Sequence, residues 1–180
     1  MISPEEFARR WGREQLAPWQ AESLEGIGIP DASKRFLTEV GLLIGVEGVA
    51  LSFAPDHRGL PTLAEFLGGS GNSRRHLSRY RRLGSNDVGL HFCIDETQDG
   101  AVFAVAPDGG DPVVFVNSGV AELAECLLQY RRQWMASRDE DDAGYAARLR
   151  SAVAGVDPAA LEADSSWWSV AVEQAGHGFL

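Results

Sequence analysis

The segment from Arg82 to Trp134 constrains the fold most, because runs of apolar residues alternate in it with strong turn signals. Val88 to Asp95 is rich in β-branched and aromatic residues, which favour a strand. Asp99-Gly100 is a dipeptide typical of tight hairpin turns, and it leads into a second apolar run from Ala101 to Val105. We therefore expect two antiparallel strands joined by this turn.

A third strand and a helix are expected to follow a second turn at residues 107–112. Val113 to Val116 is apolar at four successive positions, which a strand tolerates only where both of its faces are covered. We therefore place this run inside the sheet. Asn117-Ser118 offers oxygens that can cap a helix. The helix is indicated by apolar residues spaced three and four apart, and it should lie across the sheet: Leu123, Cys126, Leu127, Tyr130 and Trp134.

Further elements flank this segment. Ser3, Pro4 and Glu6 have the spacing of an N-cap, a first-turn proline and a capping-box acid. The other expected elements are helices from Asp31 to Val40 with Gly41 as the stop, from Asp139 onward, from Asp157-Pro158 and around Trp167-Trp168, a strand from Val46 to Phe53, and a short apolar element from Leu63 to Leu67. Together they predict an α+β fold. We expect one domain over residues 1–180, with a central antiparallel β-sheet flanked by helices and an opening helix and loop in residues 1–26.

Composition narrows the classes of function. With 180 residues, 44% of them hydrophobic, the chain can bury a core without disulfides or a structural metal. A net charge of −10 argues against general binding to nucleic acid and suits a basic protein partner. No window approaches the roughly 20 apolar residues that span a bilayer. We expect a cytoplasmic protein that binds neither nucleic acid nor a membrane.

An arginine-rich stretch at residues 74–82 is the one candidate nucleic-acid patch. It holds five Arg, one His and one Tyr without an acid, whereas residues 87–111 hold six acids and no Lys or Arg. The two segments could neutralise one another, or the arginines could contact a protein partner. Nucleic-acid binding is the weaker interpretation, because the field of the whole chain has the wrong sign for it.

His91, Cys93 and Asp95 alternate along one predicted strand and so share a face, which raises the possibility of a nucleophile or a metal site. Neighbours two apart on a strand lie about 6.5 to 7 Å apart at the backbone, which is awkward for a nucleophile and its base. The set also falls short of the four ligands that zinc prefers. The acidic string from Asp139 to Asp142 is better explained as a helix start. The sequence therefore predicts no catalytic residue, no cofactor and no metal.

The chain resembles the SUKH superfamily of immunity proteins and cell-wall-synthesis regulators, and its fourth immunity subgroup in particular. Four ordered motifs carry the resemblance: Phe36 to Leu42, Leu83-Gly84-Ser85 before Leu90 to Asp95, Phe115 to Ser118 leading into Glu125 to Tyr130, and Trp167 to Gln174. A leucine, Leu43, stands where the pattern has a proline, and the first 26 residues carry none of the motifs. The resemblance implies an α+β domain that binds a cognate toxin without catalysis.

Three functions from different classes remain. The first is an immunity protein that occludes the active site of a basic toxin, a nuclease or a deaminase, through acid-rich turns. The second is a regulatory scaffold that binds a cellular protein, and the third a small enzyme that uses the face of His91, Cys93 and Asp95. For the first, the candidate partner-binding residues are Asp95, Glu96, Asp99, Asp108 and Asp111.

Overall fold

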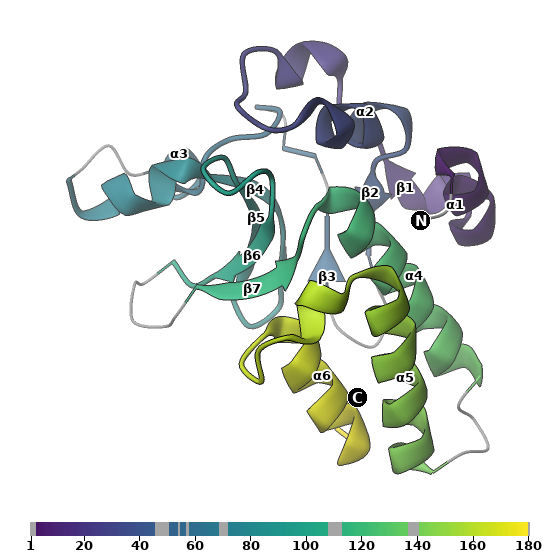
Figure 1. Ribbon diagram of the computed structural model, residues 1–180. Coiled ribbons are helices and arrows are strands. Elements are labelled where there is room, and N and C mark those ends of the chain that lie inside the picture. Colours follow the sequence, from purple (N-terminus) through teal and green to yellow (C-terminus); the bar gives the residue numbers. More distant parts are fainter. Residues whose placement is uncertain are drawn as a thin grey trace.

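The computed structural model describes residues 3–45, 51–53, 55–56, 58–68, 72–107, 113–136 and 141–179. It contains a five-stranded antiparallel sheet with helices against it, so the predicted α+β fold class is confirmed (Figure 1). In chain order, with η for a 3-10 helix, the elements are α1 (Pro4–Trp11), η1 (Arg13–Gln15), β1 (Leu16–Ala17), η2 (Ala21–Leu24), α2 (Asp31–Glu39), β2 (Leu42–Leu43), β3 (Leu51–Ser52), α3 (Leu63–Phe66), η3 (Asn72–Arg79), β4 (Tyr80–Asn86), β5 (His91–Asp95), β6 (Val102–Val105), β7 (Val114–Asn117), α4 (Val120–Ala136), α5 (Asp142–Val156), η4 (Pro158–Leu161) and α6 (Trp167–Gly176).

The strands follow the spatial order β3-β4-β5-β6-β7, and each neighbouring pair is antiparallel. The register between β4 and β5 shifts between Arg82 and Gly84. A Cβ atom at Gly84 would lie 2.2 Å from the carbonyl oxygen of Ser52 on β3. Glycine at this bulge therefore permits an approach of two backbones that any side chain would block.

Two strand predictions are corrected by the structure. Residues 80–86 form β4, where no strand was expected, and β7 lies at the edge of the sheet instead of inside it. Both faces of β7 are nevertheless covered. Phe115 contacts Phe103 on one face, with ring centroids 5.6 Å apart, and Val116 packs into the main core on the other. A run of apolar residues therefore indicates that both faces of a strand are covered. It does not show that the strand lies inside the sheet.

Two apolar clusters lie on opposite faces of the sheet. Phe92 and Ile94 of β5 belong to the larger cluster, which includes residues of α4, α5 and α6. Cys93, between them, belongs to a smaller cluster with Leu63 of α3 and Leu77 of η3. Because side chains alternate along a strand, covering both faces buries all five positions of β5.

The helices begin close to their sequence signals. The hydroxyl oxygen of Ser3 accepts a hydrogen bond from the N–H of Glu6 at 3.2 Å and caps α1 as predicted. The helix expected around Trp167-Trp168 is α6, and the side chain of Ser166 caps its start. Among the described helices, none combines the length and the apolar character that a membrane crossing requires.

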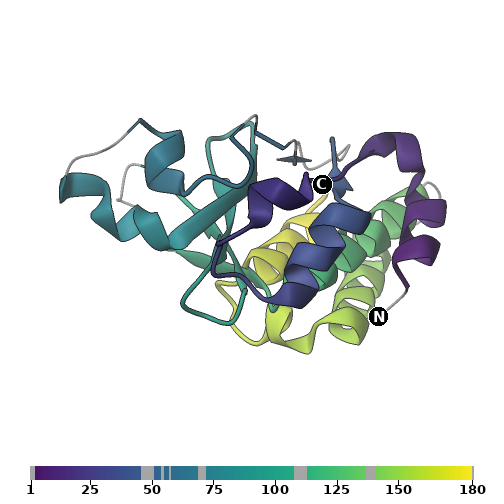
Figure 2. The same cartoon turned by 90° about the horizontal axis from the view of Figure 1, so that it is seen from above.

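An N-terminal layer lies beside the sheet. Strands β1 and β2 pair as a separate two-stranded ribbon, with Leu16 opposite Leu43. Helices α1 and α2 each pack against α4, which also contacts α5 and β7 (Figure 2). The long helix α4 therefore connects the N-terminal layer, the sheet and the C-terminal helices.

Candidate functional site

The acid-rich turn between β5 and β6 is shaped by its first residue. Asp95 is buried, and its carboxylate accepts hydrogen bonds from the N–H and hydroxyl of Thr97, at 2.8 and 2.7 Å, and from the amide of Gln98 at 3.0 Å. The Nε atom of Arg79 lies 3.3 Å from the same carboxylate. Burial acts to raise the pKa of Asp95, but these hydrogen bonds and the Arg79 charge outweigh it, and the pKa falls below its ordinary value. Asp95 therefore remains ionised and holds the turn.

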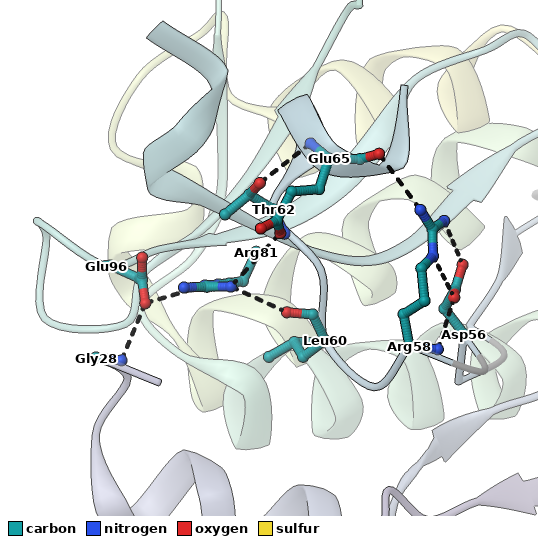
Figure 3. A network of polar contacts seen from close by, with 8 residues as sticks. All are labelled: Gly28, Asp56, Arg58, Leu60, Thr62, Glu65, Arg81 and Glu96. Carbon is teal, nitrogen blue, oxygen red and sulfur yellow. Dashed lines mark hydrogen bonds and ion pairs between the residues drawn. The ribbon is translucent and has the colours of Figure 1, made fainter. Parts of the chain in front are cut away.

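Glu96 joins this turn to the N-terminal layer. Its Oε1 atom accepts a hydrogen bond from the backbone N–H of Gly28 at 2.9 Å and lies 3.0 Å from Nε of Arg81 on β4 (Figure 3). The Glu96 side chain is only 20% exposed. One carboxylate oxygen thus connects three segments that are distant in the sequence, which restricts the movement of the turn.

Asp99 is the exposed acid at the tip of the turn, with a left-handed φ of 50°. The next residue, Gly100, has a φ of 81°, and a Cβ atom there would lie 2.7 Å from Cδ of Pro30. The turn therefore touches the segment that leads into α2, whose first residue is the exposed Asp31. We call Glu96, Asp99 and Asp31 the acidic edge.

Arg81 contacts the acidic edge through Glu96 and also joins it to the loop before α3. Besides Glu96, its guanidinium faces the carbonyl oxygen of Leu60 at 3.4 Å and Oε2 of Glu65 at 3.9 Å (Figure 3). Glu65 is itself held by a reciprocal capping box with Thr62 at the start of α3. Hydrogen bonds from Thr62 are the main cause of a lowered pKa at Glu65. Arg81 therefore sits between the carboxylates of Glu65 and Glu96.

A second arginine fixes the loop before α3. Arg58 contacts both carboxylate oxygens of Asp56 at 2.9 Å and donates to the carbonyl oxygen of Glu65 at 3.3 Å (Figure 3). A two-oxygen contact of this kind fixes the relative orientation of the guanidinium and carboxylate planes. The loop that carries Leu60 and Thr62 toward Arg81 is thereby anchored at its other end.

The predicted partner-binding residues are only partly brought together. Asp95, Glu96 and Asp99 lie in one turn, but Asp95 is buried and Glu96 is largely covered, so Asp99 is the most accessible. Asp108 and Asp111 lie outside the described residues. Sequence reasoning missed Asp31, because nothing in the sequence shows that Pro30 packs against Gly100.

The arginine-rich stretch serves the fold. Of the two explanations that the sequence left open, local neutralisation is confirmed for Arg79, which pairs with Asp95, and for Arg81, which pairs with Glu96. The antiparallel pairing of β4 with β5 places these partners together. The same stretch therefore supplies charged partners for two acids of the turn.

The face shared by His91, Cys93 and Asp95 is an interior packing surface. Burial raises the pKa of the Cys93 thiol well above its ordinary value, so the thiolate needed for a nucleophile is not populated. The Nδ1 atom of His91 accepts a hydrogen bond from Nε of Arg82 at 3.2 Å, and burial, followed by the Arg82 charge, lowers the pKa of His91. In the part of the chain that the structure describes, no cluster of three or more His, Cys, Asp or Glu side chains could hold a metal ion.

The fold and the site define an α+β protein whose acidic edge is braced by arginines and backbone contacts. A family model described as SUKH-4 immunity protein matches residues 2–174 of the 180-residue chain. The chain therefore belongs to the SUKH-4 immunity protein family, which confirms the resemblance seen in its motifs. The match begins at residue 2, so the first 26 residues also follow the family pattern. No curated protein and no solved structure matches the chain.

Proposed function

We propose that this protein binds one secreted toxin domain, a nuclease or a deaminase, and blocks its active site without catalysing a reaction. Membership of an immunity protein family supports a toxin as the partner. A toxin that acts on nucleic acid needs a basic surface for its substrate, and exposed carboxylates can take the place of phosphates there. The encounter would take place in the cytoplasm, as expected from the sequence.

The observation that carries the proposal is the bracing of the acidic edge. Glu96 is held by Gly28 and Arg81, and Gly100 fixes the turn against Pro30. Acids that are already ordered lose little conformational freedom when a partner binds, so more of the interaction energy appears as affinity. A set of flexible surface acids would serve solubility equally well without these contacts.

The test is co-expression of this chain with the toxin domain encoded beside its gene, scored by cell survival and by recovery of a stable complex. A non-cognate toxin domain of the same enzymatic class serves as the control. We expect survival and a complex with the cognate domain alone. Neither protection nor a complex would refute the proposal and favour a regulatory scaffold.

A further inference from the structure

A groove opens where α1 and α2 lie against α4. Its volume is about 240 Å³, and its walls are mainly apolar with a few charged residues among them: Pro4, Phe7, Ala32, Arg35, Phe36, Glu39, Ala121 and Glu125. All of these residues belong to the three helices. The groove therefore lies on rigid elements and not on loops, which favours a preformed site.

The lining of the groove combines large aromatic residues with small ones. The rings of Phe7 on α1 and Phe36 on α2 meet edge to face, with centroids 5.7 Å apart. Ala32 on α2 and Ala121 on α4 present only methyl groups beside them. Phe36 is only partly buried, so part of an aromatic ring remains open to an incoming side chain.

The volume indicates what the groove can hold. Pockets for small molecules usually measure roughly 300 to 1,000 Å³, so 240 Å³ is small for a whole metabolite. An apolar cavity of about 150 Å³ already accepts a benzene molecule. The groove therefore fits one aromatic side chain, the kind of group that anchors protein interfaces in well-packed pockets.

Charge at the rim indicates the surroundings of that side chain. Of the charged residues in the lining, the acid Glu39 and the base Arg35 are exposed, whereas Glu125 is buried. Glu39 is exposed at the end of α2, and the start of the same helix carries Asp31 of the acidic edge. The groove and the acidic edge thus share α2, and a basic partner seated on the edge would extend over the groove.

We infer that this groove receives an aromatic side chain of the partner toxin from a segment in which a basic residue adjoins the aromatic one. The aromatic ring packs on Phe36 between the two alanines, and the basic group faces Glu39. The identity of the partner rests on the proposed function, whereas the chemistry that the groove selects can be measured without the toxin.

The first experiment titrates the ¹⁵N-labelled protein with the dipeptide N-acetyl-Trp-Arg-amide and follows its amide resonances by NMR. We expect saturable shifts confined to residues around Phe36, Ala32 and Ala121. N-acetyl-Ala-Arg-amide, which lacks the ring, and N-acetyl-Trp-Glu-amide, which reverses the charge, should each bind more weakly by about tenfold. Equal binding of all three peptides, or shifts away from the groove, would overturn the inference.

Variants that fill the groove provide the second arm. Ala32→Phe and Ala121→Phe should each weaken dipeptide binding by about tenfold or more, because the added ring occupies the space. Ala147→Phe, at an exposed position of α5, is the matched control and should bind as the parent protein does. Two filling variants are used so that a folding defect in one, seen by circular dichroism, leaves the other to decide.

The toxin separates this inference from the proposed function. Loss of affinity for the toxin in Ala32→Phe and Ala121→Phe, with Ala147→Phe unaffected, supports both. Equal toxin binding by the parent protein and both filling variants overturns the groove as a contact and leaves the proposed function intact. If the parent protein binds no toxin, the proposed function fails, and toxin insertion into the groove fails with it even where the dipeptide binds.

Discussion

Asp157 and Ser118 lie 39 residues apart, yet both oxygens of the Asp157 carboxylate accept hydrogen bonds from Ser118. The Ser118 hydroxyl donates at 2.9 Å and its backbone N–H at 2.8 Å. Asn117 donates its amide to the same carboxylate at 2.9 Å, and its amide oxygen accepts from the indole N–H of Trp168 at 3.0 Å. These contacts tie the end of β7 to the C-terminal elements η4 and α6.

Replacement of Asp157 by Ala should destabilise the protein strongly. The buried amide of Asn117 and the donors of Ser118 would lose their acceptor, which costs more than the net value of the hydrogen bonds themselves. We expect the free energy of unfolding to fall by about 2–4 kcal/mol, measured by urea denaturation. Asp164→Ala, at an exposed position nearby, is the control and should change it by less than about 0.5 kcal/mol. Equal losses of unfolding free energy in the two variants would show that the hydrogen bonds of Asp157 do not stabilise the fold.

The same network shows where the sequence could not predict the fold. Asn117-Ser118 resembles a local helix cap, but its oxygens and donors are used by Asp157 and Trp168, which no short-range pattern connects to it. By contrast, the cap at Ser3 was predictable, because its partner, Glu6, lies three residues away.

Strand β4 was hidden for a related reason. Its arginines, Arg81 and Arg82, obscured the alternation that marks a strand. Their partners are Glu96, in the turn after β5, and His91 on β5, which no short-range pattern connects to them. Val88, expected within β5, is 77% exposed in the turn before it. Of the candidate site, the sequence located the turn with Asp99-Gly100 but not the segment of Pro30 and Asp31 that packs beside it.

Gly100→Ala should cost more stability than an equivalent change at Gly89. Both glycines have a left-handed backbone, with φ of 81° and 88°, but only Gly100 has a neighbour in the path of a Cβ atom, namely Pro30. We expect a loss of about 1 kcal/mol at Gly89 from the backbone alone and of more than about 2 kcal/mol at Gly100. Thermal unfolding of both variants measures the difference in stability. Equal losses of stability would show that Gly100 does not pack closely against Pro30.

The buried His91 should make stability depend on pH. Its pKa in the folded protein is lowered, whereas in the unfolded chain it is about 6.5. At a pH above about 6.5 both states hold a neutral imidazole, and as the pH falls below that value the unfolded state takes up the proton first. Stability should therefore decline from about pH 6.5 downward. Urea denaturation between pH 5 and 8 should show a shallower decline for His91→Gln than for His76→Gln, an exposed control.

Neither cysteine should react while the protein is folded. Burial raises the pKa of Cys93 and raises that of Cys126 to about 12, and both side chains are fully buried. At pH 8 we expect iodoacetamide to leave both thiols unmodified in the native protein and to modify both in urea, as read by mass spectrometry. Cys93→Ser should also leave toxin neutralisation unchanged. If the variant no longer neutralised the toxin, the hypothesis of a small enzyme would be restored.

Asp99→Asn tests the acidic edge with little disturbance of the fold, because asparagine tolerates the left-handed backbone at this position. Loss of one exposed charge should slow association with the toxin severalfold at low salt and change the dissociation rate little. The difference should shrink as ionic strength rises and the Debye length falls below about 8 Å. Surface plasmon resonance at several salt concentrations measures both rates. Asp164→Asn removes an equivalent exposed charge on the α6 side of the molecule, and if it slows association as much, the steering belongs to the net charge and not to this edge.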